Sequence, residues 1–272
     1  MAHVPLRLRA LLIAPGEPLP RPVRPPDRVL RYGPHPDQVV DLLEGGERGV
    51  VILLHGGFWQ AAYDRLHLRP MADALAAGGY TVGVAEYRRV GQEGGGFPGT
   101  FDDVTAAVAT VLTRAPGRGP AVLAGHSAGG HLALWHGCAG GAISGVVALA
   151  ALSDLGRTLA DGLGGGAAAA LLGDRAAELL PRLDPMRLPW RDDGRLVLVH
   201  GTRDRVVPVE MSRDYAARNP AAKLVELPGA GHFKLIDPLS RAWPAVRAAI
   251  AEAAGEDPRP PAPGAAGGEL HA

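Results

Sequence analysis

The segment Gly125-His126-Ser127-Ala128-Gly129-Gly130 decides the fold of this chain of 272 residues. It follows an apolar run typical of a buried strand, residues 121–124, and precedes a helical pattern over residues 128–138. A G-x-S-x-G motif between a strand and a helix predicts a sharp, strained turn that exposes the serine hydroxyl. We therefore expect Ser127 to be a nucleophile. The alternative is a glycine-rich helix start in which Ser127 is the N-cap.

On both sides of this segment, short apolar runs alternate with longer helical patterns. Each run has four or five residues and is bounded by glycine or polar residues, as strands buried on both faces are. Such alternation predicts an α/β fold, a mostly parallel sheet covered by helices. The predicted strands are residues 50–54, 81–85, 121–124, 146–149 and 196–199, with a short one at 223–227, and the helices are about 66–77, 101–114, 128–138, 209–217 and 238–253.

Composition divides the chain into three parts. Residues 1–27 end in a proline-rich stretch that cannot donate to a sheet, so we expect an extended arm. Residues 255–272 are rich in proline, glycine and alanine, which predicts a disordered tail. The domain itself spans residues 28–254. Glycine-rich residues 156–190 interrupt the alternation of strands and helices after a predicted strand. We expect them to form a small cap insertion over the sheet edge.

Charge and cysteine content argue against several classes of protein. Lys plus Arg and Asp plus Glu are 28 each, so the chain lacks the basic field that nucleic-acid binding needs. One cysteine, Cys138, rules out an internal disulfide framework and multi-thiolate zinc sites. No stretch approaches the roughly 20 apolar residues that span a bilayer. The apolar run at residues 10–14 is too short for a signal peptide, so we expect a cytoplasmic protein.

A serine nucleophile needs a base and a group that orients the base. Asp204 lies in a turn after the last confident strand, and His232 lies in a glycine-flanked loop after the next one. The order serine, acid, histidine is the one expected when the nucleophile sits in this kind of turn. Asp154, also just past a strand, is the competing acid. For the other nearby histidines we expect structural roles: His55, His126, His131 and His200.

A second glycine pair follows the strand at residues 50–54, in His55-Gly56-Gly57-Phe58-Trp59. Glycines let this backbone approach a reacting carbonyl, so we expect the N–H groups of Gly57 and Phe58 to form an oxyanion hole with the N–H of Ala128. Two aromatic residues beside the predicted site, Trp59 and Phe233, are candidates for substrate binding. Packing in the core is the alternative for both.

Together these motifs resemble the α/β-hydrolase fold, and within it the kynurenine formamidase-like (arylformamidase) and carboxylesterase branch. The resemblance extends from about Tyr32 to Ala253 and includes the segments Glu86-Tyr87-Arg88 and Phe97-Pro98. It implies the triad Ser127, Asp204 and His232. Lipases related to hormone-sensitive lipase carry a third glycine where this chain has Phe58, and related peptidases carry tyrosine at the position of Ala128.

The resemblance implies a serine hydrolase that cleaves a small carboxylic ester or aryl formamide through an acyl-enzyme. No metal or organic cofactor is expected, because the chain has no HExxH motif, no P-loop and no dinucleotide-binding glycine motif. The expected partner is a small apolar or aromatic molecule. A ligand-binding protein without catalysis and a prolyl-oligopeptidase-like peptidase are the alternative functions, and the oligomeric state stays open, with a homodimer as one option.

Overall fold

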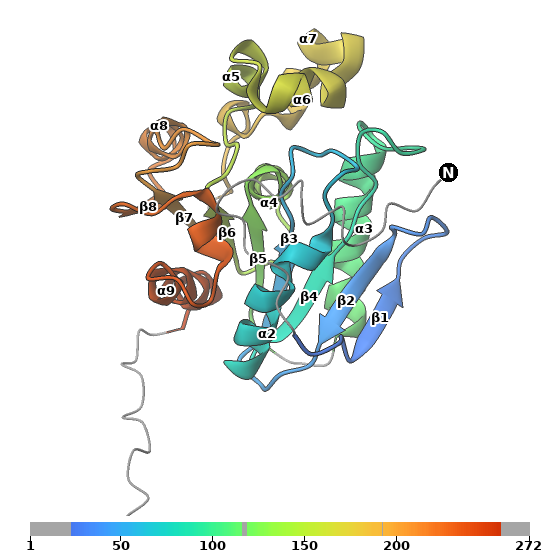
Figure 1. The fold of residues 1–272 in the computed structure, drawn as a ribbon, viewed down its shortest axis with the longest axis vertical. Coiled ribbons are helices and arrows are strands. Elements are labelled where there is room, and N and C mark those ends of the chain that lie inside the picture. Colours follow the sequence, from blue (N-terminus) through green and yellow to red (C-terminus); the bar gives the residue numbers. More distant parts are fainter. Residues whose placement is uncertain (1–22, 116–118, 192, 257–272) are drawn as a thin grey trace, which may run out of the picture.

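A computed structural model describes residues 23–115, 119–191 and 193–256. In this part of the chain a single sheet of eight strands has the order β1-β2-β4-β3-β5-β6-β7-β8 (Figure 1). β1 and β2 pair antiparallel, as do β2 and β4, and all other pairs are parallel. The strands are β1 (Arg28–Arg31), β2 (Val39–Leu43), β3 (Val50–Leu54), β4 (Thr81–Ala85), β5 (Ala121–His126), β6 (Gly145–Leu149), β7 (Arg195–Gly201) and β8 (Ala222–Leu227).

The central strands are apolar on both faces because helices cover both sides of the sheet. Along β3, Ile52 and Leu54 belong to one core, whereas Val51 and Leu53 belong to the other. The first core packs under α3 (Gly99–Arg114), α4 (Ala128–Cys138) and α8 (Glu210–Arg218), and the second under α2 (Arg69–Ala77) and α9 (Trp243–Ala254). Continuous apolar runs therefore predicted these strands well, and the predicted α/β fold is confirmed.

Three short helices fill the predicted insertion between β6 and β7, and they group together at one end of the sheet (Figure 1). They are α5 (Leu155–Ala160), α6 (Leu163–Leu172) and α7 (Ala176–Leu183), followed by the 3₁₀ turn η3 (Pro185–Arg187). At the start of α6, Gly164, Gly165 and Gly166 all have positive φ, at 63°, 69° and 82°. Only glycine adopts such a run without strain, which explains the glycine-rich composition here.

The structure differs from the sequence prediction at several boundaries. β1 and β2 were not predicted as strands from the residue pattern; β1 exposes three of its four residues, so it lacks a long apolar run. The helix expected over 238–253 begins only at Trp243, because η4 (His232–Ile236) and an irregular segment precede it. β7 runs on to Gly201, so His200 lies inside the strand.

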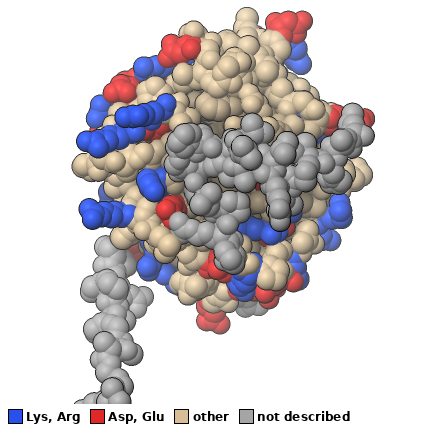
Figure 2. All heavy atoms as spheres, in the orientation of Figure 1, with Lys and Arg blue, Asp and Glu red and all other residues tan. Residues whose placement is uncertain are grey.

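The ends of the described chain are fixed to the domain. The Asp27 N–H donates to Leu42 O at 2.9 Å, just before β1. Past α9, Tyr80 Oη donates to Glu256 Oε1 at 2.7 Å. Of the predicted arm (residues 1–27) and the predicted tail (residues 255–272), residues 1–22 and 257–272 lie outside the described residues. None of the described helices is long and apolar enough to cross a membrane, and Figure 2 shows both charge signs around the rim of the face it draws.

Candidate active site

The turn between β5 and α4 holds Ser127 in a conformation that L-residues rarely adopt. Its φ is 56° and its ψ is −117°, a strained combination that persists only where neighbouring contacts impose it. The Ser127 N–H donates to Leu149 O at 2.9 Å, and its carbonyl accepts from the His131 N–H at 3.1 Å. The side chain makes no capping hydrogen bond to α4. The alternative of a plain N-cap therefore does not describe this turn.

Both motif glycines are required by close backbone approach. A Cβ on Gly125 would lie 2.0 Å from Gly129 O, and a Cβ on Gly129 would lie 2.1 Å from Leu54 O. Neither contact can be relieved by rotating a side chain, because both obstacles are backbone atoms. The start of α4 thus packs directly against the ends of β5 and β3, and this packing fixes the position of Ser127.

Asp204 and His232 lie in contact beyond the ends of β7 and β8. His232 Nδ1 is 2.6 Å from Asp204 Oδ2. The other carboxylate oxygen, Oδ1, accepts from the N–H groups of Val206 at 2.8 Å and Val207 at 2.9 Å. These bonds fix the carboxylate plane, so that Oδ2 faces the imidazole. The structure therefore brings the predicted acid and base together.

The environment of Asp204 favours its ionised form. Burial alone would raise its pKa, but hydrogen bonds from His200 and His232 and from the Val207 N–H hold the pKa well below its usual range. His200 Nε2 is 3.4 Å from Asp204 Oδ2, and His200 Nδ1 is 2.7 Å from Ser212 Oγ. His200 thus braces the acid loop, the structural role that the sequence suggested.

The loop that carries His232 packs against the turn that carries Ser127. His126, the residue before the serine, has its Nε2 3.2 Å from the carbonyl oxygen of His232. The two imidazole rings are 4.5 Å apart between centroids. Both His232 and Ser127 are almost completely buried, at 5% and 2% exposure. His126 and His232, which are 106 positions apart along the chain, thus come into contact beside the serine turn.

The loop after β3 has an unusual backbone conformation. Gly57 and Phe58 have positive φ, at 110° and 52°, and neither of their N–H groups donates to another residue in the described parts of the chain. The cap rests on this loop, because a Cβ on Gly164 would lie 2.4 Å from the Phe58 ring and Gln60 Nε2 donates to Gly164 O at 3.2 Å.

A buried ionic network that the sequence analysis did not identify supports the same loop. Glu86, at the end of β4, accepts from His55 Nε2 at 2.8 Å and pairs with Arg89 at 2.7 Å. Burial would raise the pKa of Glu86, but His55, Arg89 and the Arg65 N–H outweigh it and lower the pKa to about 2. Tyr87 Oη donates to His55 O at 2.7 Å. In the sequence, the feature that could have indicated this network is an acidic residue directly after a buried strand.

The two aromatic candidates occupy different environments. Trp59 is fully buried, and its ring lies edge-on to that of His131 at 5.1 Å between centroids. This burial favours packing over substrate contact for Trp59. Phe233 is only partly buried, and its ring is 5.0 Å from that of His232. Phe233 therefore borders the base.

Asp154, the competing acid, has a different partner. Its Oδ1 accepts from the Arg157 N–H at 2.7 Å and caps α5 at the start of the insertion. Burial raises the pKa of Asp154, only partly opposed by that hydrogen bond. The carboxylate thus caps the first helix of the insertion between β6 and β7.

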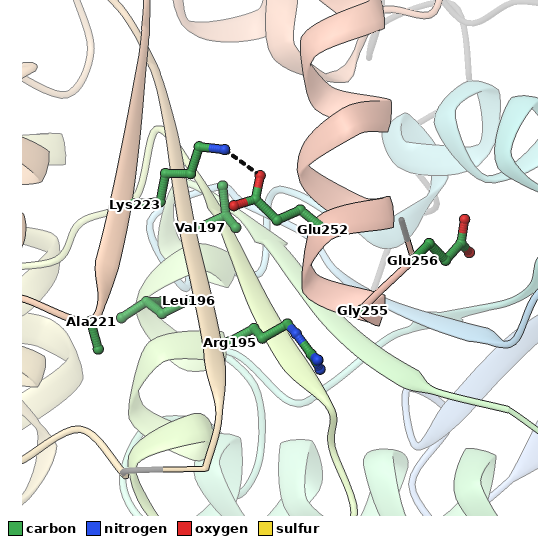
Figure 3. Close-up of a pocket in the computed structure, with 8 residues that line it drawn as sticks. All are labelled: Arg195, Leu196, Val197, Ala221, Lys223, Glu252, Gly255 and Glu256. Carbon is green, nitrogen blue, oxygen red and sulfur yellow. Dashed lines mark hydrogen bonds and ion pairs between the residues drawn. The ribbon is translucent and has the colours of Figure 1, made fainter. Parts of the chain in front are cut away.

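A separate surface cavity of about 520 Å³ lies between β7, β8 and the end of α9 (Figure 3). Its lining includes Arg195 and the ion pair of Lys223 and Glu252, whose charged atoms are 2.6 Å apart. Arg195 begins β7, whereas Asp204 follows the end of the same strand, so this cavity lies at the opposite edge of the sheet from the triad candidates. Over the described residues, no three His, Cys, Asp or Glu side chains are grouped to hold a metal ion.

Comparison with known proteins finds similarity to several esterases. It is 37% identical over 70 residues to esterase LipC of Mycobacterium tuberculosis, a match that spans 24% of this chain and 17% of that protein. A proposed thioesterase from Silicibacter sp. TM1040 superposes with a TM-score of 0.69 at 26% identity, covering 82% of this chain and 86% of that one. Esterase B of Lactobacillus rhamnosis, solved with a tributyrin phosphonate, gives a TM-score of 0.66 at 20% identity, covering 84% and 85%.

The resemblance to the α/β-hydrolase fold is thereby confirmed, whereas the arylformamidase branch is not singled out by these matches. A family model described as BD-FAE matches residues 42–218. That range is more than half of the chain, and it includes the loop after β3, the serine turn, helices α5, α6 and α7, and Asp204. The chain belongs to the BD-FAE family of the α/β-hydrolase fold.

Proposed function

We propose that this protein is a serine esterase that hydrolyses carboxylic esters of small apolar or aromatic molecules. The observation that carries the proposal is the strained turn at Ser127 (φ 56°), with the paired His232 and Asp204 packed beside it. A backbone held in this region is maintained against a free-energy cost of about 1–3 kcal/mol, and such strain concentrates at functional sites.

The reaction proceeds in two acyl transfers. His232 Nε2 takes the proton from Ser127 Oγ as that oxygen attacks the ester carbonyl. Asp204, bonded to Nδ1 at 2.6 Å, holds the proton on that nitrogen and stabilises the imidazolium. The alcohol leaves with the proton from Nε2. A water molecule, deprotonated by the same nitrogen, then attacks the acyl-enzyme carbonyl. The acyl–Oγ bond breaks, the acid is released, and the proton passes from Nε2 to Oγ, which restores the Ser127 hydroxyl.

The negative charge on the carbonyl oxygen requires donors that are already oriented. We assign this role to the N–H groups of Gly57, Phe58 and Ala128. Two of them lie on the loop held by Glu86 and His55, and the third begins α4, at the positive end of its dipole. A donor of this kind is worth about 3–4 kcal/mol in the transition state.

The test is labelling with a fluorophosphonate, which reacts with activated serines. The wild type should be labelled at Ser127 and should hydrolyse p-nitrophenyl acetate, whereas Ser127→Ala should do neither. Labelling that persists in Ser127→Ala would refute the assignment of the nucleophile. A wild type whose ester turnover does not exceed that of the variant would support the alternative of a ligand-binding protein.

A formamidase is the second candidate, because aryl formamides undergo the same acyl transfer and Phe233 offers an aromatic contact beside the base. Turnover of N-formylkynurenine and of an aryl acetate separates the two. Turnover of the acetate at least tenfold faster than that of N-formylkynurenine would refute the formamidase candidate. A peptidase is disfavoured by Ala128, which stands where related peptidases carry tyrosine.

A further inference from the structure

His126 is a buried side chain that the proposed reaction does not use. It is 2% exposed and lies at the end of β5, immediately before Ser127. Its Nε2 is 3.2 Å from the carbonyl oxygen of His232. A carbonyl only accepts hydrogen bonds, so the imidazole carries its proton on Nε2 and donates it there.

The same ring also reaches the oxyanion loop. A Cβ on Gly56 would lie 3.2 Å from His126 Nδ1, 3.0 Å from His126 O and 3.0 Å from the Ser127 Cβ. Gly56 thus passes close over His126 and Ser127, and a Cβ there would make unusually tight contacts. On its other side the His126 ring meets His232 at 4.5 Å and Phe233 at 5.9 Å between centroids.

Three separate loops therefore meet on this one imidazole: the serine turn, the loop after β3 and the base loop. Each provides a different part of the proposed active site, and no continuous element of secondary structure joins them. Burial, and next the positive charge of His232, lowers the pKa of His126 well below its usual value. The ring thus stays neutral when His232 is protonated during the reaction, and its Nε2–H donor is retained.

We propose that His126 is a positioning residue of the esterase. Its hydrogen bond to the backbone of His232 holds that residue where its imidazole reaches Ser127. The inference rests on the proposed function, and the Nε2–H to His232 O bond is the contact that carries it. A displacement of the base by about 1 Å is enough to lower catalysis on the order of 100-fold.

The test compares two substitutions of similar size. His126→Leu removes the donor, whereas His126→Gln keeps an N–H donor at a similar reach. His126→Leu should lower kcat for p-nitrophenyl acetate about 10- to 100-fold while KM stays within about twofold, and His126→Gln should recover most of the loss. His136→Leu, which changes a histidine near the far end of α4, is the matched control and should behave as wild type.

Hydrogen exchange followed by mass spectrometry supplies a readout that does not require activity. In His126→Leu, amides of residues 229–236 should exchange faster, whereas residues 69–85 on α2 and β4 should keep their wild-type rates. Unchanged kcat together with unchanged exchange would overturn the proposal. So would equal loss in the Gln and Leu variants, or exchange that rises equally in both segments. If the wild type hydrolyses no ester, the proposed function fails. The exchange comparison then still shows whether His126 holds the His232 loop in place.

Discussion

Replacing Asp204 by asparagine isolates the role of one oxygen atom. Oδ1 accepts from the N–H groups of Val206 and Val207, so the amide oxygen must remain at that position. The amide nitrogen then takes the place of Oδ2, 2.6 Å from His232 Nδ1. An amide nitrogen only donates. His232 must therefore accept on Nδ1 and carry its proton on Nε2, where it cannot remove the proton of Ser127.

The expected loss in kcat is about 10⁴-fold, the effect of the same exchange in serine proteases that use this triad. Four powers of ten correspond to about 5 kcal/mol of transition-state stabilisation. The fold should be retained, because asparagine has nearly the volume of aspartate and keeps both backbone bonds. The loss of kcat thus comes from the wrong histidine tautomer and the missing negative charge, and not from altered packing.

The assay is steady-state hydrolysis of p-nitrophenyl acetate at pH 7–8, with circular dichroism and the melting temperature as checks of folding. Asp154→Asn is the matched control, since its carboxylate also follows a strand but caps α5. It should keep activity within about threefold, because asparagine is an equally good N-cap. A folded Asp204→Asn variant that keeps more than a tenth of the wild-type kcat would refute the assignment, as would a 10³-fold loss in Asp154→Asn.

Two further variants test the scaffold. Glu86→Gln removes the buried carboxylate that His55, Arg65 and Arg89 share, while Arg65 keeps Asp41 and Arg89 keeps Asp37. It should lower the free energy of unfolding by about 1.5–3 kcal/mol at pH 7 in urea titrations, the cost of lost hydrogen bonds to a charged group. Because the folded-state pKa of Glu86 is lowered to about 2, its contribution is complete above the unfolded-state pKa of roughly 4.3 and is lost as the pH falls toward 2; a variant with the same acid sensitivity as wild type would contradict this. Gly129→Ala forces a Cβ to 2.1 Å from Leu54 O and should give no stable, active protein, whereas Gly78→Ala, with φ −77° and a nearest contact of 3.1 Å, should melt within a few degrees of wild type.

Much of the sheet could be predicted because local pattern and burial agree. The runs Val50–Leu54 and Thr81–Ala85 are strands with the predicted bounds, since a strand covered by helices on both faces must be apolar throughout. β1 carries no such signature, because it lies at the edge of the sheet and is mostly exposed. β2 is buried throughout, but Asp41 interrupts its apolar run. Their pairing depends on partners elsewhere in the chain.

The strained turn at Ser127 could be predicted from local sequence, because only glycine at positions 125 and 129 permits the close backbone approach found there. The sequence also ordered the acid and base candidates along the chain. Three features depend on contacts between distant segments: Asp204 rather than Asp154 faces His232, Trp59 is buried, and His126 and Glu86 contact the surrounding loops. Backbone strain is a local property that a few residues encode, whereas the partner of a buried polar group is chosen by segments that meet only after the chain has folded.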